Sequence, residues 1–91
     1  MTDEWDDVSY VISSRYRVAT LERLKEGPAT PSLIASDTDL SIAHISRALQ
    51  ELQEEGLVTL LVSESRRKGR VYGTTEEGQT VIETIQAEEM V

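Results

Sequence analysis

Cysteine is absent from this chain of 91 residues, and His44 is its single histidine. The lack of cysteine excludes disulfides, thiolate nucleophiles and thiolate metal sites. One histidine cannot form the His clusters that bind zinc, and it argues against a histidine-based catalytic centre. The sequence also contains no glycine-rich loop of the kind that holds phosphates. We therefore expect a protein that is not an enzyme and that uses no metal ion or other cofactor.

Long apolar runs are missing as well. No segment approaches the roughly 20 apolar residues that cross a bilayer, and the acidic first residues, MTDEWDD, do not resemble a signal peptide. The expected location is the cytoplasm, with no membrane partner. Phenylalanine is also absent, so the core of this single domain must be small and aliphatic. A core of that kind is marginally stable, so association with a second subunit would add to the stability of the fold.

Acidic residues outnumber basic ones by 17 to 9, but they are unevenly distributed. Residues 1–7 and 75–91 together contain nine acidic residues and no basic one. The segment 8–74 therefore holds all nine bases against eight acids, and it is free to present a basic surface. Only two of the bases are lysines. This acid-rich, lysine-poor composition resembles that of proteins from halophilic archaea; an ordinary acidic bacterial or archaeal protein is the alternative.

Apolar periodicity and capping signals divide the chain into short elements. The expected elements are an acidic arm over 1–7, helices over 8–26, 31–38, 42–55 and 76–90, and a β-hairpin over 57–74. Thr30-Pro31 and Ser41 supply the N-terminal signals of two helices, because a hydroxyl accepts from free backbone N–H groups and proline suits the first helical position. Gly27 and Gly56 end two helices.

The hairpin is predicted from an abrupt change of pattern after Gly56. A β-prone run, LVTLLV, leads into a polar tip, SESRRKG, and RVYGT is the expected returning strand. Thr74 or Thr75 is expected to cap the last helix, with Thr74 and Glu77 as a candidate capping box. Gly78 is expected to allow close packing in the first turn of that helix.

This order of elements is that of a winged helix-turn-helix domain spanning residues 1–91. The fold class is α+β, mostly α, with a three-helix core, a β-hairpin wing and a C-terminal helix. The residues expected to face the core are Val8, Val11, Ile12, Ala19, Leu21, Leu24, Leu33, Ile34, Ala35, Leu40, Ile42, Ile45, Leu49, Leu52, Val81, Ile82 and Ile85.

Three segments carry a resemblance to known regulators: SSRYRVATLERLKEGPATPSLIA, LSIAHISRALQELQEEGLV and RRKGRVYGTTEEGQTVI. From about Ile12 to Ile85 the chain resembles the small winged-helix transcription regulators of archaea and bacteria, of the MarR and ArsR types. The resemblance implies a regulator that binds double-stranded DNA sequence-specifically. Helix 42–55 would then lie in the major groove as the recognition helix, and the wing on the backbone or in the minor groove. Metal-sensing members of these families use Cys or His clusters that this chain lacks.

The candidate DNA-binding residues lie opposite the apolar stripe of helix 42–55, at the start of helix 31–38 and in the wing. They are Thr30, Ser32, Ser41, Ala43, His44, Ser46, Arg47, Gln50, Arg66, Arg67, Lys68 and Arg70. Arg47 suits a guanine edge, Gln50 an adenine edge and Ala43 a thymine methyl. The hydroxyls, His44 and the wing bases suit phosphates, and Ser41 and Ser46 are also short enough to reach a base edge. The acids of this helix cluster at its C-terminal end, which points away from DNA in this docking: Glu51, Glu54 and Glu55.

Two hypotheses for function remain open. A regulator of this size is expected to bind as a symmetric homodimer, since two half-sites raise affinity and specificity. The expected dimer contact uses the first and last helices, through Trp5, Tyr10, Ile82, Ile85 and Met90. The alternative is a winged-helix protein–protein interaction module of transcription or chromosome machinery, although such a module has no need for arginine in both wing and recognition helix.

Overall fold

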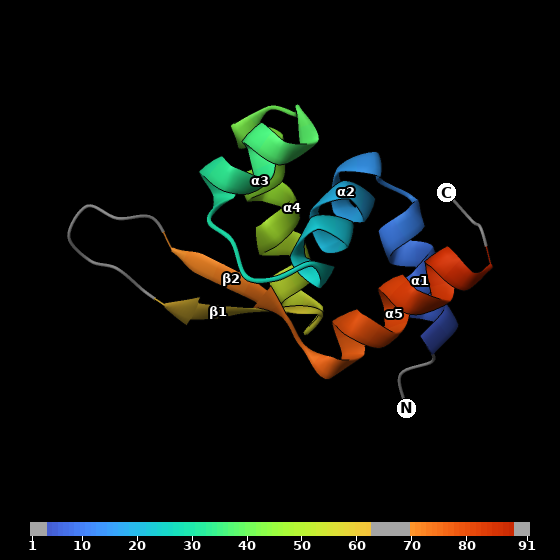
Figure 1. Ribbon diagram of the computed structural model, residues 1–91. Coiled ribbons are helices and arrows are strands. Elements are labelled where there is room, and N and C mark those ends of the chain that lie inside the picture. The colour runs from blue at the N-terminus through green and yellow to red at the C-terminus, as the bar shows by residue number, and fades with distance from the viewer. Residues whose placement is uncertain (1–3, 63–69, 89–91) are drawn as a thin grey trace.

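The computed structural model describes the backbone of residues 4–62 and 70–88 and the side chains of residues 6–61 and 70–88. Within them the elements are α1 (Glu4–Ile12), α2 (Arg15–Lys25), α3 (Pro31–Thr38), α4 (Ile42–Glu54), β1 (Val58–Val62), β2 (Val71–Thr74) and α5 (Glu76–Ala87), as Figure 1 shows. Helices α2, α3 and α4 pack against one another, and β1 pairs with β2 in an antiparallel hairpin. This arrangement is the predicted winged helix, mostly helical, with the hairpin as its wing.

The N-terminal region differs from the prediction of one helix over 8–26. The chain forms two helices, α1 and α2, with a break at Ser13 and Ser14. Ser14 has an extended backbone and its hydroxyl accepts from the Arg17 backbone N–H at 3.3 Å, while the Ser13 hydroxyl donates to the Tyr10 carbonyl at 2.8 Å. Serine hydroxyls compete in this way for the backbone groups that a continuous helix would pair. The predicted acidic arm over 1–7 is also wrong in part, because α1 begins at Glu4.

The helix-turn-helix unit, α3 and α4, is built as the local signals predict. Thr30 caps α3 by accepting from the Leu33 backbone N–H at 3.1 Å, and Pro31 occupies the first turn. Asp39 ends α3 in the left-handed region, at a φ of 59° that aspartate tolerates better than most residues. Ser41 then caps α4 by accepting from the Ala43 backbone N–H at 3.2 Å.

The wing is attached to the rest of the domain at its base. Tyr72 in β2 exchanges two backbone hydrogen bonds with Ala29, at 3.0 and 2.9 Å, so the segment before α3 lies beside the hairpin. At the other end, the Thr75 hydroxyl accepts from the Gly78 backbone N–H and donates to the Gly56 carbonyl. Thr75 is therefore the cap of α5, and Thr74 is not.

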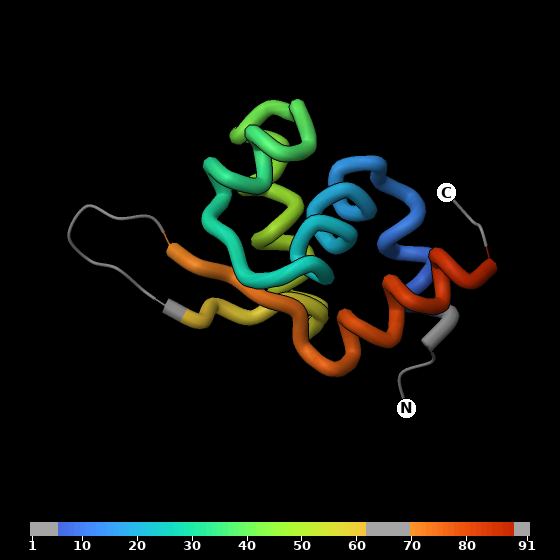
Figure 2. The backbone as a smooth tube through the Cα atoms, viewed as in Figure 1, coloured from blue at the N-terminus to red at the C-terminus, as the bar shows by residue number. Residues whose placement is uncertain are grey.

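Gly78 confirms the expected close packing of α5. A Cβ at this position would lie 1.9 Å from the carbonyl oxygen of Leu57, so no larger residue fits without a backbone shift. Helix α5 then packs against α1 and α2, and Figure 2 shows α1 and α5 together at the end of the molecule away from the hairpin. The last two positions of the predicted helix 76–90 lie outside the described residues.

The core contains most of the residues predicted for it, together with Val18, Ala48 and Leu57. Three predictions are wrong, because Ile12, Leu33 and Ile42 expose 38%, 44% and 49% of their surface. Ile12 and Ile42 are the last and first residues of their helices, where the apolar stripe extends past the packed elements. Across the part of the chain that is described, no helix is both long and apolar enough to span a bilayer.

Candidate nucleic-acid interface

Helix α4 has one buried and one exposed face. Ile45, Ala48, Leu49 and Leu52 are buried against the other helices. The five residues predicted to face outward from α4 are all exposed: Ala43, His44, Ser46, Arg47 and Gln50. Their outward orientation is thus confirmed, whereas their contact with DNA stays a prediction.

A groove runs along one edge of this exposed face, between α4, the start of α3 and the wing. Five of the predicted site residues line it, from three separate parts of the chain: Thr30, Ser32, Ser46, Gln50 and Arg70. The bridge between Ala29 and Tyr72 explains this convergence, because it holds the start of α3 beside the residues that follow Arg70. No acidic residue is among the described residues that line the groove.

Ile42 also lines this groove, which the sequence did not indicate. Its spacing from Ile45, Leu49 and Leu52 places it on the apolar stripe, and periodicity alone predicts burial. The structure instead leaves it half exposed, beside Pro31 and Ser46. The sequence does contain one signal for this exposure. Ile42 directly follows the cap Ser41 in the first turn of α4, and the end of a helix can project beyond the elements that pack against it.

The other edge of the exposed face contacts the start of α2. The His44 ring stacks on the Tyr16 ring, with centroids 4.3 Å apart and an interplanar angle of 13°. The guanidinium of Arg15 lies 5.4 Å from the centroid of the same tyrosine ring. Arg15 is thus next to the ring that His44 of α4 contacts, an arrangement that spacing within one helix does not indicate.

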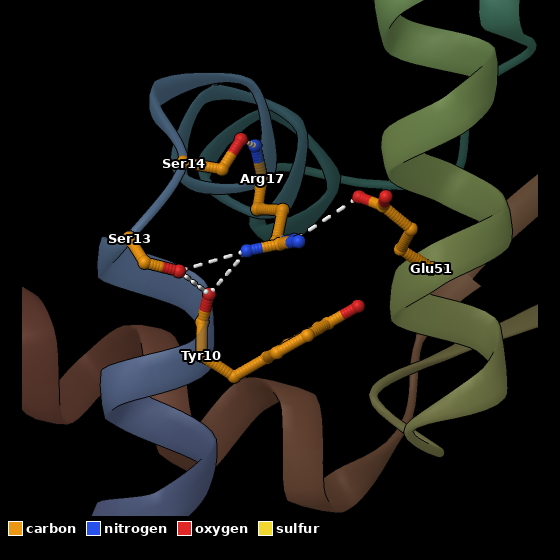
Figure 3. A network of polar contacts seen from close by, with 5 residues as sticks. All are labelled: Tyr10, Ser13, Ser14, Arg17 and Glu51. Atoms are coloured by element: carbon orange, nitrogen blue, oxygen red, sulfur yellow. Dashed lines mark hydrogen bonds and ion pairs between the residues drawn. The ribbon is translucent and has the colours of Figure 1, made fainter.

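Arg17 joins α4 to the turn between α1 and α2 (Figure 3). Its Nε donates to Glu51 Oε1 at 3.1 Å, and its Nη1 donates to the Tyr10 carbonyl at 2.7 Å and to Ser13 Oγ at 2.9 Å. The guanidinium also lies 3.9 Å from the centroid of the Tyr10 ring. The side chain of Arg17 is only 16% exposed, so this arginine belongs to the packed structure and not to a solvated face. Among the acids at the C-terminal end of α4, Glu51 is therefore paired with a base from α2.

Acidic residues gather at the C-terminal end of α4 rather than beside the groove. Asp7, Glu55, Glu76 and Glu77 line a second depression between α1, the residues that follow α4, and α5. Partial burial raises the pKa of Asp7 above its ordinary value, and the negative charges of Glu55, Asp6 and Glu77 raise that pKa further. The N-terminal half of α4 is thereby separated from this negative charge.

The remaining predicted residues divide into three groups. Arg66, Arg67, Lys68 and Met90 lie outside the described residues, as does the side chain of Trp5. Ile82 and Ile85 were expected in a dimer contact, and this expectation is wrong because both are fully buried in the chain's own core. Tyr10 is half-buried beneath Arg17. Within the described ranges, no group of three or more His, Asp or Glu side chains is placed to hold a metal ion.

Comparison with known proteins gives one family and several related folds. Residues 5–90 match the model of the HVO_A0261 N-terminal domain. No curated protein matches the chain. Among solved structures, a MarR family transcription regulator is 29% identical with a TM-score of 0.76, over 85% of this chain and 52% of that one.

Two further structures have the same fold at lower identity. A mutant of ZitR from Lactococcus lactis is 23% identical with a TM-score of 0.74, over 85% of this chain and 53% of that one. The reduced form of the transcriptional regulator YodB from B. subtilis is 19% identical with a TM-score of 0.79, over 99% of this chain and 89% of that one. The chain thus spans about half the length of the ZitR and MarR family chains that it matches.

Proposed function

The chain belongs to the HVO_A0261 N-terminal domain family, and from its MarR-type winged-helix fold we propose that it is a transcription regulator that binds double-stranded DNA sequence-specifically. Helix α4 enters the major groove, and the wing follows the backbone or the adjacent minor groove. One observation carries the proposal. Hydroxyl, amide and guanidinium groups from α3, α4 and the wing converge on one groove beside the exposed face of α4.

The exposed face of α4 has the dimensions and donors for base readout. A major groove about 12 Å wide admits a helix, and the small residues Ala43 and Ser46 let the backbone of α4 approach the bases. Arg47 then donates to the acceptors of a guanine, and Gln50 pairs with an adenine edge. Glu54, which is exposed, lies on the last turn of α4 and stays outside the groove when the N-terminal half enters first.

Residues on both sides of α4 suit the phosphates. The hydroxyls of Thr30 and Ser41 accept from backbone N–H groups as helix caps, and each keeps its own proton to donate to a phosphate oxygen. Arg70 is exposed and lines the groove, and in the sequence it follows the predicted wing bases Arg66, Arg67 and Lys68. On the opposite edge of α4, His44 faces the phosphates of the second DNA strand. Such contacts position the domain without reading sequence.

The regulator is proposed to act as a symmetric homodimer. Helices α1 and α5 form the end of the molecule away from the hairpin, so a contact there leaves both wings free. Trp5, Tyr10 and Met90 remain the candidates for this contact. Light scattering coupled to size exclusion measures the mass, and a monomer at micromolar concentration would contradict the dimer.

The charge composition bears on how binding depends on salt. A net charge of −8 and two lysines suit a salt-rich cytosol, as in halophilic archaea, where phosphate contacts contribute little. Each neutralised phosphate contributes a slope of about −0.9 to the log of the binding constant against the log of salt. We expect specific binding that relies on groove fit, base contacts and a few arginines, and that persists in 1 M potassium chloride. A steep loss of affinity toward that concentration would contradict this expectation.

Selection of bound sites from random duplexes, followed by fluorescence anisotropy, tests the proposal. Arg47→Ala is expected to weaken specific binding by roughly 5- to 150-fold, the equivalent of about 1–3 kcal/mol, and to relax the preference at one base pair. Lys25→Ala is the charge-matched control, because Lys25 lies at the end of α2 and donates to Gln86 of α5. Failure to select any duplex, at any salt concentration, would favour the protein–protein interaction module instead.

A further inference from the structure

Ile42 is an exposed apolar side chain in a groove that polar and apolar residues line together. Four large apolar residues are exposed within the described part of the chain: Ile12, Leu33, Ile42 and Leu61. Of these four, Ile42 alone lines the groove with Ser46, Gln50 and Arg70. Single exposed apolar residues are common on protein surfaces and need no explanation by themselves. The position of this one, inside the proposed base-reading surface, is what calls for an account.

The backbone holds Ile42 as a rigid projection. It is the first residue of α4, directly after the cap Ser41, whose hydroxyl accepts from the Ala43 backbone N–H. A β-branched side chain in a helix has one strongly preferred χ1 rotamer, so Ile42 loses little side-chain entropy when a ligand covers it. One and two turns further along α4, Ser46 and Gln50 lie on the same edge of the helix.

We propose that Ile42 reads the 5-methyl group of a thymine in each DNA half-site, beside the bases that Ser46 and Gln50 contact. The inference rests on the proposed function and deepens it. Among the base edges of the major groove, the thymine methyl is the one large apolar group, whereas cytosine has only a hydrogen at the same ring position and most other edge atoms are hydrogen-bond donors or acceptors. Packing an isoleucine against a donor or acceptor would remove its water without supplying a partner, which is unfavourable. Ile42 therefore both favours thymine and disfavours other bases at its position.

Deoxyuridine gives a direct probe, because it differs from thymidine only by the absence of this methyl group. In the selected duplex, each thymidine is replaced in turn by deoxyuridine, and the dissociation constant is measured by fluorescence anisotropy. For the unchanged protein, deoxyuridine at one position in each half-site is expected to weaken binding about fourfold. This factor corresponds to the free energy of burying one methyl-sized group. For Ile42→Ala the loss at that position is expected to disappear, while losses at other positions stay the same.

Leu33→Ala is the matched control, since Leu33 is similarly exposed but is not among the residues that line the groove. It is expected to keep the full deoxyuridine profile of the unchanged protein. Thermal unfolding of Ile42→Ala close to that of the unchanged protein shows that the variant is folded. Specific binding with no sensitive thymidine, or the same sensitivity in Ile42→Ala, would overturn this inference and leave the proposed function standing. Absence of any specific duplex binding would overturn both.

Discussion

Removing the guanidinium of Arg17 is the sharpest test of how the domain holds its recognition helix. Arg17→Ala deletes a hydrogen-bonded ion pair to Glu51, a hydrogen bond to the Tyr10 carbonyl, another to Ser13 Oγ and the contact with the Tyr10 ring. It also leaves the Tyr10 carbonyl and the Glu51 carboxylate without their shared donor. The change affects α1, α2 and α4 together, because the network connects all three (Figure 3).

The magnitude follows from partial burial. The side chains of Arg17 and Glu51 are 16% and 31% exposed. The energy of their ion pair is therefore expected to lie between two limits. A solvated pair contributes about 0–1 kcal/mol, whereas breaking a buried pair costs about 3–5 kcal/mol. A hydrogen bond from a charged donor adds roughly 1.5–3 kcal/mol, and these contributions overlap because one group makes all of them. We therefore expect Arg17→Ala to lower the free energy of unfolding by about 2–4 kcal/mol.

Urea unfolding followed by circular dichroism measures this loss. Glu51→Gln keeps an acceptor for Arg17 but removes the charge, so a smaller loss of about 0.5–1 kcal/mol is expected. Arg15→Ala is the matched control, since Arg15 is exposed and should change stability by no more than about 0.5 kcal/mol. An Arg17→Ala variant as stable as Arg15→Ala would refute the reasoning. So would a double mutant of Arg17 and Glu51 whose losses simply add.

Three further changes test other parts of the structure. Thr20 is fully buried, and its hydroxyl has no hydrogen-bond partner within the described residues. The isosteric Thr20→Val should therefore stabilise the domain by about 1 kcal/mol in the same urea assay. A loss of stability would instead indicate that the hydroxyl has a partner. Gly78→Ala places a Cβ against the Leu57 carbonyl and should cost about 3 kcal/mol or prevent folding, and a neutral result would contradict the tight contact. For Asp7, a raised pKa means that the folded state binds the proton more tightly than the unfolded state, so stability falls as pH rises through the folded-state pKa and stays lower above it. Asp7→Asn should therefore raise the urea midpoint at pH 7, with a difference that shrinks toward pH 4; a difference independent of pH would contradict the assignment.

Much of the fold could be predicted because its signals are short in range. Thr30, Ser41 and Gly56 act on backbone groups within a few residues, and the structure uses each of them as a helix boundary. The outward face of α4 also follows from local geometry, since residues at positions 43, 46, 47 and 50 lie opposite the buried stripe in any regular helix. The candidate site on α4 was predictable to that extent.

Other parts of the site could not be predicted because they depend on residues distant in sequence. Arg17 and Glu51 are 34 positions apart, and nothing in either segment indicates the pairing. The break at Ser13 was missed because an apolar period continues across it. Ile42 was assigned to the core because periodicity describes one helix and contains no information on where its neighbours end.

What the sequence alone determined is the order of elements, their caps and the separation of polar from apolar faces, since each arises from contacts within one helix or one turn. Tertiary packing decided which of those faces meet. The bridge from Ala29 to Tyr72 brings α3 and the wing together into a groove, and the limited length of the core leaves Ile42 exposed within it. The physical reason is that burial depends on all surrounding elements at once, whereas a helix boundary depends on a few adjacent backbone groups.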